Sequence, residues 1–445
     1  LPMNQYKIAI VGATGMVGRK FLQVLEERKP AGCEYTLFAS ARSAGTEITF
    51  MGRPHVVEEL TETCFDGRGF DIALFSAGGS TSEKYDPHAA AAGCIVVDNS
   101  SAWRMDERCP LVVPEVNPEA LEGHNGIIAN PNCSTIQMVV ALKPLHDAAG
   151  IRRVVVSTYQ AVSGSGQKGI SELETQVRQM FNLKEPEVNV YPHRIAFNCI
   201  PHIDVFLEND YTKEEMKMVH ETVKIMRDPN VKVTATCVRV PVFYGHSESV
   251  NIETERKLSA KEARAILAQA PGVQVYDNPS EKMYPLAVDA AGEDATYVGR
   301  IREDDTIPNG LNMWIVADNI RKGAALNAVQ IAEELVRRDL LGVKDRTQNP
   351  WDVFMNTYKV GDVANVRIVK LMTFGAFAEV VPGVDGLIHI SQIADRRIDK
   401  PSDVLAEGDK VDAKIIAIDE DKKKISLSIR ALLTPAAEEE APVEE

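Results

Sequence analysis

Short apolar and β-branched runs alternate with helical patterns through the first 145 residues, and this alternation constrains the fold more than any other feature. The first run is Lys7-Ile8-Ala9-Ile10-Val11, and similar runs recur at 35–39, 71–75 and 94–98. Parallel strands need a crossover connection, which is usually a helix. The pattern therefore predicts a doubly wound parallel sheet, an α/β Rossmann-type domain over residues 1–133.

The pattern changes twice further along the chain. Residues 134–319 contain longer strand-like runs and predict an α+β domain with a mixed or antiparallel sheet, after which a helix at about 320–342 is expected to pack back on the Rossmann-type domain. A linker is expected at 343–355. Residues 356–432 hold five strand-like runs separated by Gly, Pro and Asp turns, which is compatible with a small closed all-β barrel of the OB type. Residues 433–445 are expected to form an acidic disordered tail.

Composition indicates a soluble protein of a reducing compartment. The 445 residues have a formal net charge of −15, which argues against general coating of nucleic acid. No run reaches the roughly 18 apolar residues of a membrane span, and no leader is visible, so we expect a cytoplasmic protein without membrane contact. The seven cysteines are an odd number with no CxxC spacing, and we expect no metal site.

A glycine-rich loop follows the first predicted strand, with a GxxGxxG spacing that begins at Gly12. Glycine allows a tight turn and a close approach of backbone to pyrophosphate, while the next helix N-terminus favours negative charge. The alternative is a purely structural turn. The contacts to a dinucleotide are expected from Gly12, Thr14, Gly15, Met16 and Val17.

The loop after the second strand indicates which dinucleotide binds. Ser40, Arg42 and Ser43 occupy the place where an acidic residue usually holds the ribose hydroxyl of NAD. An arginine there offers charge-assisted donors to a 2′-phosphate. The sequence therefore favours NADP as the cofactor.

Cys133 stands where an apolar strand, ended by Pro131 and Asn132, meets the start of a predicted helix. Unpaired backbone N–H groups and the helix dipole at such a position favour an anion, and they should lower the thiol pKa from about 8.5. Cys133 is thus a candidate covalent catalyst. A buried structural cysteine is the alternative.

Residues 5–342 resemble the bacterial aspartate-β-semialdehyde dehydrogenases. They match that family's dinucleotide loop, its Asn-Cys-Ser nucleophile segment at 132–134, its glutamine segment at 157–166 and its Arg-to-His segment at 238–247, in the same order. The resemblance implies reversible, NADP-dependent conversion of L-aspartyl-4-phosphate to L-aspartate-4-semialdehyde with release of phosphate. It also implies a homodimer or homotetramer and a place in lysine, methionine and threonine biosynthesis.

The residue types suit this chemistry. Thiolate Cys133 would attack the acyl phosphate to form a thioester, and hydride transfer would reduce the thioester to a thiohemiacetal that collapses to the aldehyde. His246 would act as the acid and base, unless it is a surface or core histidine. Arg239 and His246 are seven residues apart, which would place them on opposite faces of one regular strand unless Pro241 and Gly245 break it.

The resemblance also implies roles for other polar residues. Arg239 would bind the substrate carboxylate as a planar fork, Gln160 would orient the substrate, and Glu214 would contact its ammonium group. The remaining implied contacts are Arg104, Asn132 and Lys217 for phosphate, and Ser163, Gly164 and Asn319 for the cofactor.

Each of these assignments has a plainer alternative. Arg239 would suit a surface salt bridge, and Gln160, Ser163 and Gly164 an ordinary strand end and turn. Glu214 and Lys217, three apart on one helix face, would suit a solvated surface, and Asn319 a helix cap.

The chain departs from the family pattern in two places. The second serine of the family's 2′-phosphate loop is Ala41 here, and the segment between Gln179 and Pro192 is shorter than in many relatives. The short segment is expected to alter the dimer contacts or the edge of the substrate pocket.

Residues 356–432 resemble the RNA-binding repeat of ribosomal protein S-one, through the segments 358–363, 375–377, 386–391 and 425–430. Phe374, Phe377 and His389 would form a platform on which bases of single-stranded RNA stack. The alternative is that the aromatics are barrel core. Lys370, Arg367 and Arg430 would hold phosphates, and binding should be weak and salt-sensitive.

Three functions therefore compete. The first is an NADP-dependent aspartate-semialdehyde dehydrogenase with an appended RNA-binding module. The second is a sibling such as N-acetylglutamyl-phosphate reductase, which would share the cysteine and histidine but would not use Glu214 and Lys217 as substrate contacts. The third is an RNA-associated protein whose catalytic half is vestigial.

Overall fold

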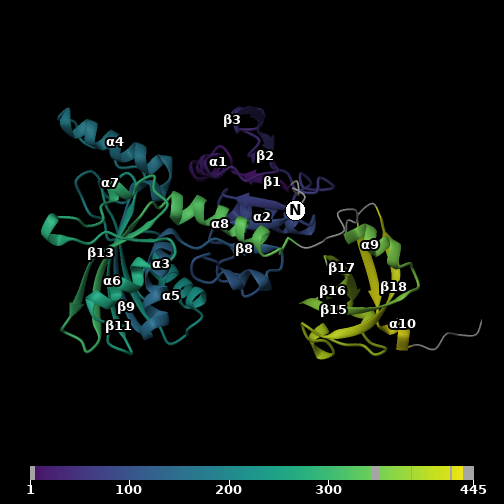
Figure 1. The fold of residues 1–445 in the computed structure, drawn as a ribbon. Helices are drawn as coiled ribbons and strands as arrows, with labels where there is room; N and C mark the ends of the chain where they lie inside the picture. Colours follow the sequence, from purple (N-terminus) through teal and green to yellow (C-terminus); the bar gives the residue numbers. More distant parts are fainter. Residues whose placement is uncertain (1–5, 342–349, 382, 421–422, 434–445) are drawn as a thin grey trace, which may run out of the picture. The chain divides into compact units, whose positions relative to one another are not determined.

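The computed structural model describes residues 6–341, 350–381, 383–420 and 423–433 (Figure 1). The chain divides into two compact units, Leu1–Gly342 and Val343–Glu445. Most of the expected linker 343–355 lies outside the described residues, but its last part is helical and belongs to α9 (Pro350–Thr357). The expected tail lies outside them from residue 434 onward. No helix among the described residues has the length and apolarity needed to cross a membrane.

The first unit begins with the predicted parallel sheet. Six strands lie in the order β5-β2-β1-β6-β7-β8, and every neighbouring pair is parallel. The expected α/β Rossmann-type domain is confirmed. Its elements are β1 (Tyr6–Val11), α1 (Met16–Arg28), β2 (Cys33–Ala39), the hairpin β3 (Glu47–Phe50) and β4 (Arg53–Val56), β5 (Glu58–Glu59), β6 (Ile72–Phe75), α2 (Gly79–Ala91), β7 (Ile95–Asp98) and β8 (Ile127–Ala129).

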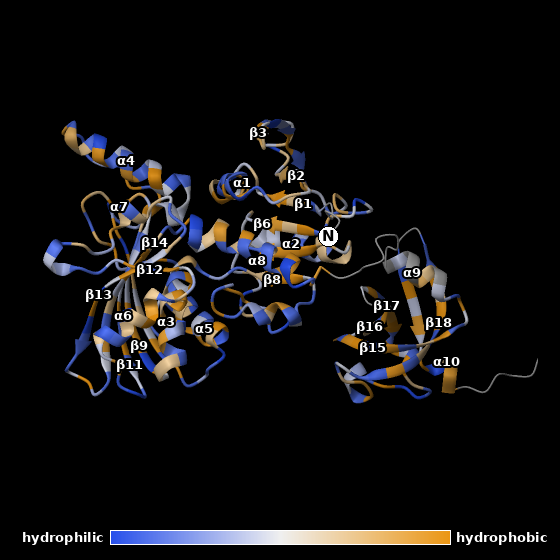
Figure 2. Cartoon of the chain, in the orientation of Figure 1, coloured by the Kyte–Doolittle hydropathy of each residue, from blue (hydrophilic) through white to orange (hydrophobic). Residues whose placement is uncertain are grey.

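Burial explains why the apolar runs became these strands. Every residue of β6 and β7 is buried, as expected for central parallel strands covered on both faces, and β1 and β6 are coloured hydrophobic in Figure 2. The late helix α8 (Leu326–Arg337) packs into the same hydrophobic cluster as β1 and α1. The chain between them is therefore inserted into this domain.

The inserted part contains a second, mixed sheet in the order β10-β9-β11-β14-β13-β12. Helices α3, α5 and α6 contact its strands. Its elements are α3 (Cys133–Ala149), β9 (Ile151–Gln160), α4 (Gln167–Phe181), α5 (Lys213–Met226), β10 (Lys232–Arg239), β11 (His246–Thr254), α6 (Ala260–Ala268), β12 (Val273–Val275), α7 (Ala287–Ala290), β13 (Thr296–Asp304) and β14 (Gly310–Ala317). This confirms the expected α+β domain.

The second unit is a closed five-stranded barrel in the order β15-β16-β17-β19-β18, as the turn spacing predicts. Alternating small and branched side chains fill its interior, among them Val366, Ala376, Ile388 and Leu427. Its elements are α9, β15 (Val363–Met372), β16 (Gly375–Val381), β17 (Val384–His389), β18 (Lys410–Asp419), β19 (Lys424–Ser428) and the short α10 (Arg430–Leu433).

Candidate active site

Three strand ends meet at one edge of the mixed sheet. Strands β9 and β10 are parallel and end with Gln160 and Arg239, which are direct register partners. Strand β11 runs antiparallel to β9 and begins there with His246. Arg239 and His246 thus lie on two strands. This confirms the alternative that the chain breaks at Pro241 and Gly245. The chain reverses between Arg239 and His246 through Gly245, whose φ of +90° suits glycine.

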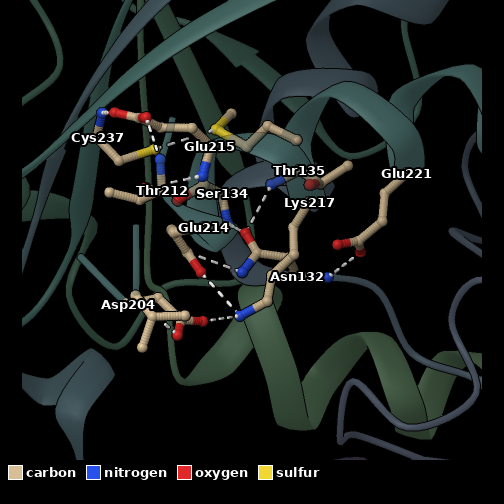
Figure 3. Close-up of polar contacts among 12 residues, drawn as sticks. Asn132, Ser134, Thr135, Asp204, Thr212, Glu214, Glu215, Lys217, Glu221 and Cys237 are labelled. Atoms are coloured by element: carbon tan, nitrogen blue, oxygen red, sulfur yellow. Dashed lines mark hydrogen bonds and ion pairs between the residues drawn. The ribbon is translucent and has the colours of Figure 1, made fainter. Parts of the chain in front are cut away.

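Cys133 is the first residue of α3. Asn132 caps this helix, because its side-chain oxygen accepts hydrogen bonds from the backbone N–H of Ser134 at 3.0 Å and of Thr135 at 3.4 Å (Figure 3). On the other side, Gly323 packs so closely that a Cβ there would lie 2.8 Å from the Cβ of Cys133. Gly323 belongs to a π-helical turn, Arg321–Ala325, a geometry frequent at functional sites.

The surroundings of Cys133 favour the neutral thiol over the thiolate. Burial raises its pKa to about 12, with the negative charge of Glu214 adding to the effect. Arg239, Arg104 and the backbone N–H of Ser134 oppose the shift but do not reverse it. The expectation of a lowered pKa is therefore wrong, because the helix terminus lies in an interior where desolvation outweighs it.

Glu214, on α5, lies at the centre of the polar contacts drawn in Figure 3. Its carboxylate accepts hydrogen bonds from Asn132 Nδ2 at 2.9 Å, from Gln160 Nε2 at 3.4 Å and from Lys217 Nζ at 3.2 Å. Lys217 also binds Asp204 at 2.9 Å. Burial favours the neutral lysine, but Glu214 and Asp204 together raise the pKa of Lys217 above its ordinary value. The alternative that Glu214 and Lys217 lie on a solvated helix face is wrong, since Glu214 is only 6% exposed.

Arg104 is held beside this cluster. Its Nε donates to the carbonyl of Asn130 at 2.9 Å, and its Nη1 lies 3.6 Å from a carboxylate oxygen of Glu221. The other oxygen of Glu221 accepts the backbone N–H of Asn132 at 2.7 Å. Lys224 Nζ binds three backbone carbonyls of the Arg104 loop, at 2.8, 2.8 and 2.9 Å. The arginine is thus fixed in place by backbone carbonyls and one buried acid.

His246 is fully buried and its protonation state is set by the backbone. Its Nδ1 accepts the N–H of Ala161 at 3.0 Å, so the proton of the neutral ring resides on Nε2. Burial and the nearby Arg239 lower the pKa of His246 well below its ordinary value. Nε2 has no partner among the described residues. The ring is therefore arranged as a neutral donor at Nε2 rather than as a base toward the thiol.

The glycine loop has the form that a dinucleotide requires. Gly12 has a φ of +81°, and a Cβ there would lie 2.1 Å from the carbonyl oxygen of Ser76, so only glycine fits. Gly15 occupies the N-cap of α1 without a side-chain cap. The loop residues Thr14, Met16 and Val17 are partly exposed around the free N–H groups of this helix end.

The other expected cofactor residues lie in two places. Ser40 and Arg42 are exposed and Ser43 is partly exposed, in a turn after β2 where the N–H of Ser43 binds the carbonyl of Ser40. Asn319 is buried and binds both the N–H of Gly245 and the hydroxyl of Ser163, at 3.0 Å each. It is not the helix cap, because Asp318 accepts the N–H groups that open the π-helical turn.

Gly164 closes the side of the site shared by His246 and Arg239. A Cβ at this position would lie 2.7 Å from Arg239 Nη1 and 3.5 Å from His246 Nε2. Gly164, an expected cofactor contact, thus lies directly against Arg239, the expected substrate contact, and His246, the expected acid and base.

Sequence reasoning missed several residues of the site. Glu221 lies seven residues after Glu214, a helical spacing that could have revealed one acidic face. Asp204 and Gly323 carry no local signal, because their role appears only when distant segments meet. The Arg104 loop is likewise held by Lys224 from another element.

The three aromatic residues expected to bind RNA, Phe374, Phe377 and His389, lie outside the buried core of the barrel. Phe374 is 44% exposed, and its ring lies 6.4 Å from that of Phe377 in an edge-to-face arrangement. His389 is exposed and opposite Gly375 on the neighbouring strand. Lys370 is the register partner of Phe377. The alternative that these aromatics form the barrel core is therefore wrong.

Comparisons with known proteins agree with this geometry. A family model described as "Semialdehyde dehydrogenase, NAD binding domain" matches residues 7–124, and "Semialdehyde dehydrogenase, dimerisation domain" matches 142–322. A third, "S1 RNA binding domain", matches 357–430. The chain is 60% identical over 340 residues to the aspartate-semialdehyde dehydrogenase of Aquifex aeolicus, covering 76% of this chain and 99% of that protein.

Solved structures show the same relation. The fold is similar to a crystal structure of aspartate semialdehyde dehydrogenase II complexed with ASA from Vibrio cholerae, with a TM-score of 0.72 and 51% identity over 75% of this chain and 99% of that one. It is also similar to an aspartate semialdehyde dehydrogenase with NADP from Candida albicans, with a TM-score of 0.59 and 26% identity over 76% of this chain and all of the other.

Proposed function

The chain belongs to the aspartate-semialdehyde dehydrogenase family, as a phosphorylating aldehyde oxidoreductase with an appended S1 RNA-binding domain, and on this premise we propose its reaction. It reduces L-aspartyl-4-phosphate reversibly to L-aspartate-4-semialdehyde, with NADP as cofactor and release of phosphate. The observation that carries the proposal is the meeting of Cys133, Gln160, Arg239 and the buried Glu214 around one pocket edge.

The first step forms a thioester on Cys133. Its Sγ attacks the acyl carbon of the acyl phosphate, and the bond from that carbon to the phosphate oxygen breaks. The departing phosphate takes the thiol proton, so a thiol with a raised pKa is a sufficient starting state. Arg104 and Lys217 are the cations that attract the phosphate group.

The second step reduces this thioester. When bound, NADPH supplies the hydride to the carbonyl carbon. His246 Nε2–H donates a hydrogen bond to the carbonyl oxygen and stabilises the negative charge that develops on it, as a neutral imidazole can. Breaking the C–S bond then releases the aldehyde and the Cys133 thiolate, which the N-terminus of α3 stabilises until a solvent proton neutralises it.

Substrate recognition needs one cation and one anion. The guanidinium of Arg239 is a suitable fork for the substrate carboxylate, and Glu214 is the buried carboxylate for its ammonium group. A substrate with an acetylated amine carries no such charge. The buried Glu214 therefore favours an aspartyl substrate over the N-acetylglutamyl one.

The residues present fit NADP. Gly12 has no room for a side chain, the start of α1 has no side-chain cap, and Arg42 is exposed beyond the end of β2. The pyrophosphate would bind at the helix N-terminus and the 2′-phosphate at Arg42, while Ser163, Gly164 and Asn319 would hold the nicotinamide end. The Candida albicans relative solved with NADP supports this choice.

The enzyme is further proposed to be a homodimer. The family model of residues 142–322 is a dimerisation domain. Tyr159 is 36% exposed, and its ring lies 5.5 Å from that of Trp314. Along β9, Tyr159 stands between buried residues and so points to the opposite face of the sheet from them. An aromatic pair of this kind is typical of an interface.

The barrel is proposed to bind single-stranded RNA. The exposed Phe374 and His389 and the partly exposed Phe377 offer faces on which bases can stack, with Lys370 beside Phe377 for phosphate. An electrophoretic shift at low salt should be lost in Phe374→Ala/Phe377→Ala and kept in Cys133→Ser. The absence of any shift by the wild type would contradict RNA binding.

The catalytic proposal is tested by NADP reduction with aspartate semialdehyde in the presence of phosphate. Cys133→Ser should abolish turnover. Cys199→Ser, which changes an exposed cysteine, is the matched control and should keep it. Turnover of N-acetylglutamate semialdehyde in place of aspartate semialdehyde would favour the sibling activity. An inactive wild type would favour a vestigial catalytic half.

A further inference from the structure

The segment between α4 and Pro192 folds back onto α4, where side chains of α4, Glu172 among them, bind its backbone. Glu172, which is 7% exposed, accepts hydrogen bonds from the backbone N–H groups of Asn189 at 3.0 Å, Val190 at 2.5 Å and Tyr191 at 3.3 Å. A buried carboxylate that binds three N–H groups fixes the backbone there. This is the segment that the resemblance predicts to be shorter than in many relatives.

Tyr191 is consequently held in one position. Its hydroxyl donates to Ser165 Oγ at 3.0 Å, within the 3₁₀ turn Val162–Ser165 that carries Ser163 and Gly164. Gly169 leaves the space for this hydroxyl, because a Cβ there would lie 2.6 Å from it. The ring is thus fixed at both ends, by its backbone and by its hydroxyl.

The ring of Tyr191 lies against Arg239. The guanidinium carbon is 5.9 Å from the ring centroid, within the range of a cation–π contact. On its other side, Nη1 donates to the carbonyl of Ala161 at 2.8 Å. This is the one hydrogen bond of the Arg239 side chain found among the described residues. The remaining N–H groups stay available for a ligand.

We propose that Tyr191 is a positioning residue that fixes the guanidinium of Arg239 for the substrate carboxylate, and so determines which aldehydes the site accepts. The inference rests on the proposed function, because it needs Arg239 to bind that carboxylate. Its chemistry is specific, since an aromatic face orients a planar cation in a way that an aliphatic side chain does not. The hydroxyl of Tyr191 helps to hold the ring in place, and the ring in turn orients the guanidinium of Arg239.

Steady-state kinetics of three Tyr191 variants test this. Tyr191→Phe keeps the ring, whereas Tyr191→Leu and Tyr191→Met keep apolar bulk without it. The two aliphatic variants should raise KM for aspartate semialdehyde about tenfold, which is about 1.4 kcal/mol. Their KM for phosphate should not change. Tyr191→Phe should stay within about twofold of the wild type, as ring retention requires.

Phe181→Leu is the matched control. It removes an exposed ring from the end of α4, which contacts the ring of Phe197 rather than that of Tyr191, and should leave all constants unchanged. Unchanged KM for the aldehyde in both aliphatic variants would overturn the inference, and so would an equal rise in KM for phosphate. If one variant does not fold, the other decides. A wild type without turnover would instead overturn the proposed function, and the inference with it.

Discussion

Replacing Glu248 by Gln should stabilise the protein at high pH. Glu248 lies on β11 two residues after His246, is 0% exposed, and neither of its carboxyl oxygens has a hydrogen-bond partner among the described residues. Gln137 of α3 faces it and donates to the carbonyl of His246 at 3.2 Å. Gln137 thereby joins the helix that starts with Cys133 to the strand that starts with His246.

The size of this change in the free energy of unfolding follows from the single proton that Glu248 binds. Burial raises the pKa of Glu248 well above its ordinary 4.5, and the contact with Gln137 only partly opposes this. Above pH 4.5 the unfolded chain therefore releases a proton that the folded chain retains. The higher pKa of Glu248 in the folded protein therefore makes the folded state more stable at low pH than at high pH. This contribution to the free energy of unfolding is fully present below pH 4.5 and is lost as the pH rises toward the pKa of Glu248 in the folded protein. The loss is about 1.4 kcal/mol per pH unit.

Thermal unfolding of the two proteins between pH 5 and pH 9 measures this difference. The melting temperature of Glu248→Gln should rise relative to the wild type by roughly 2 °C per pH unit, over the pH range in which the folded protein keeps this proton, because the unit Leu1–Gly342 has a large entropy of unfolding. Glu253→Gln, a change on a partly exposed residue of the same strand, is the control and should run parallel to the wild type. A Glu248→Gln curve that runs parallel to the wild type, or falls below it at high pH, would refute the reasoning.

Two further substitutions test the pocket. Gly323→Ala should lower kcat by roughly 10- to 100-fold, because the new Cβ would lie 2.8 Å from the Cβ of Cys133 and overpacking costs about 1–3 kcal/mol. An unchanged kcat would show that the π-helical turn does not position the thiol. Arg42→Ala should raise KM for NADP roughly tenfold or more, because one charge-assisted hydrogen bond is lost, and should leave KM for NAD unchanged. Equal effects on both cofactors would contradict a contact between Arg42 and the 2′-phosphate.

Local sequence signals predicted the frame of the molecule well. The apolar runs 72–75 and 95–97 indicated strands of a parallel, doubly wound sheet, and they became the buried strands β6 and β7. The glycine spacing predicts a tight turn at Gly12, and its φ of +81° fits that expectation; its close approach to Ser76 was not expected. Such signals work because strand burial and glycine geometry depend mainly on local residues.

Electrostatics and turn geometry could not be predicted in the same way. The charge state of Cys133 depends on how deeply the helix start is buried and on Glu214, a residue 81 positions away, so the helix dipole alone gave the wrong direction. The tautomer of His246 depends on the N–H of Ala161. Strand periodicity alone could not decide between one regular strand and a break between Arg239 and His246, and the chain does reverse there.

The most direct test of the account is whether an aspartyl group becomes attached to Cys133. Aspartate semialdehyde and NADP, mixed rapidly with the enzyme in the absence of phosphate, should form NADPH in a single burst of at most one equivalent per subunit. Intact-protein mass spectrometry should then show one added aspartyl group, which peptide mapping assigns to Cys133 and which phosphate removes. Continuous turnover without phosphate, or full activity with no acylated Cys133, would contradict the thioester mechanism.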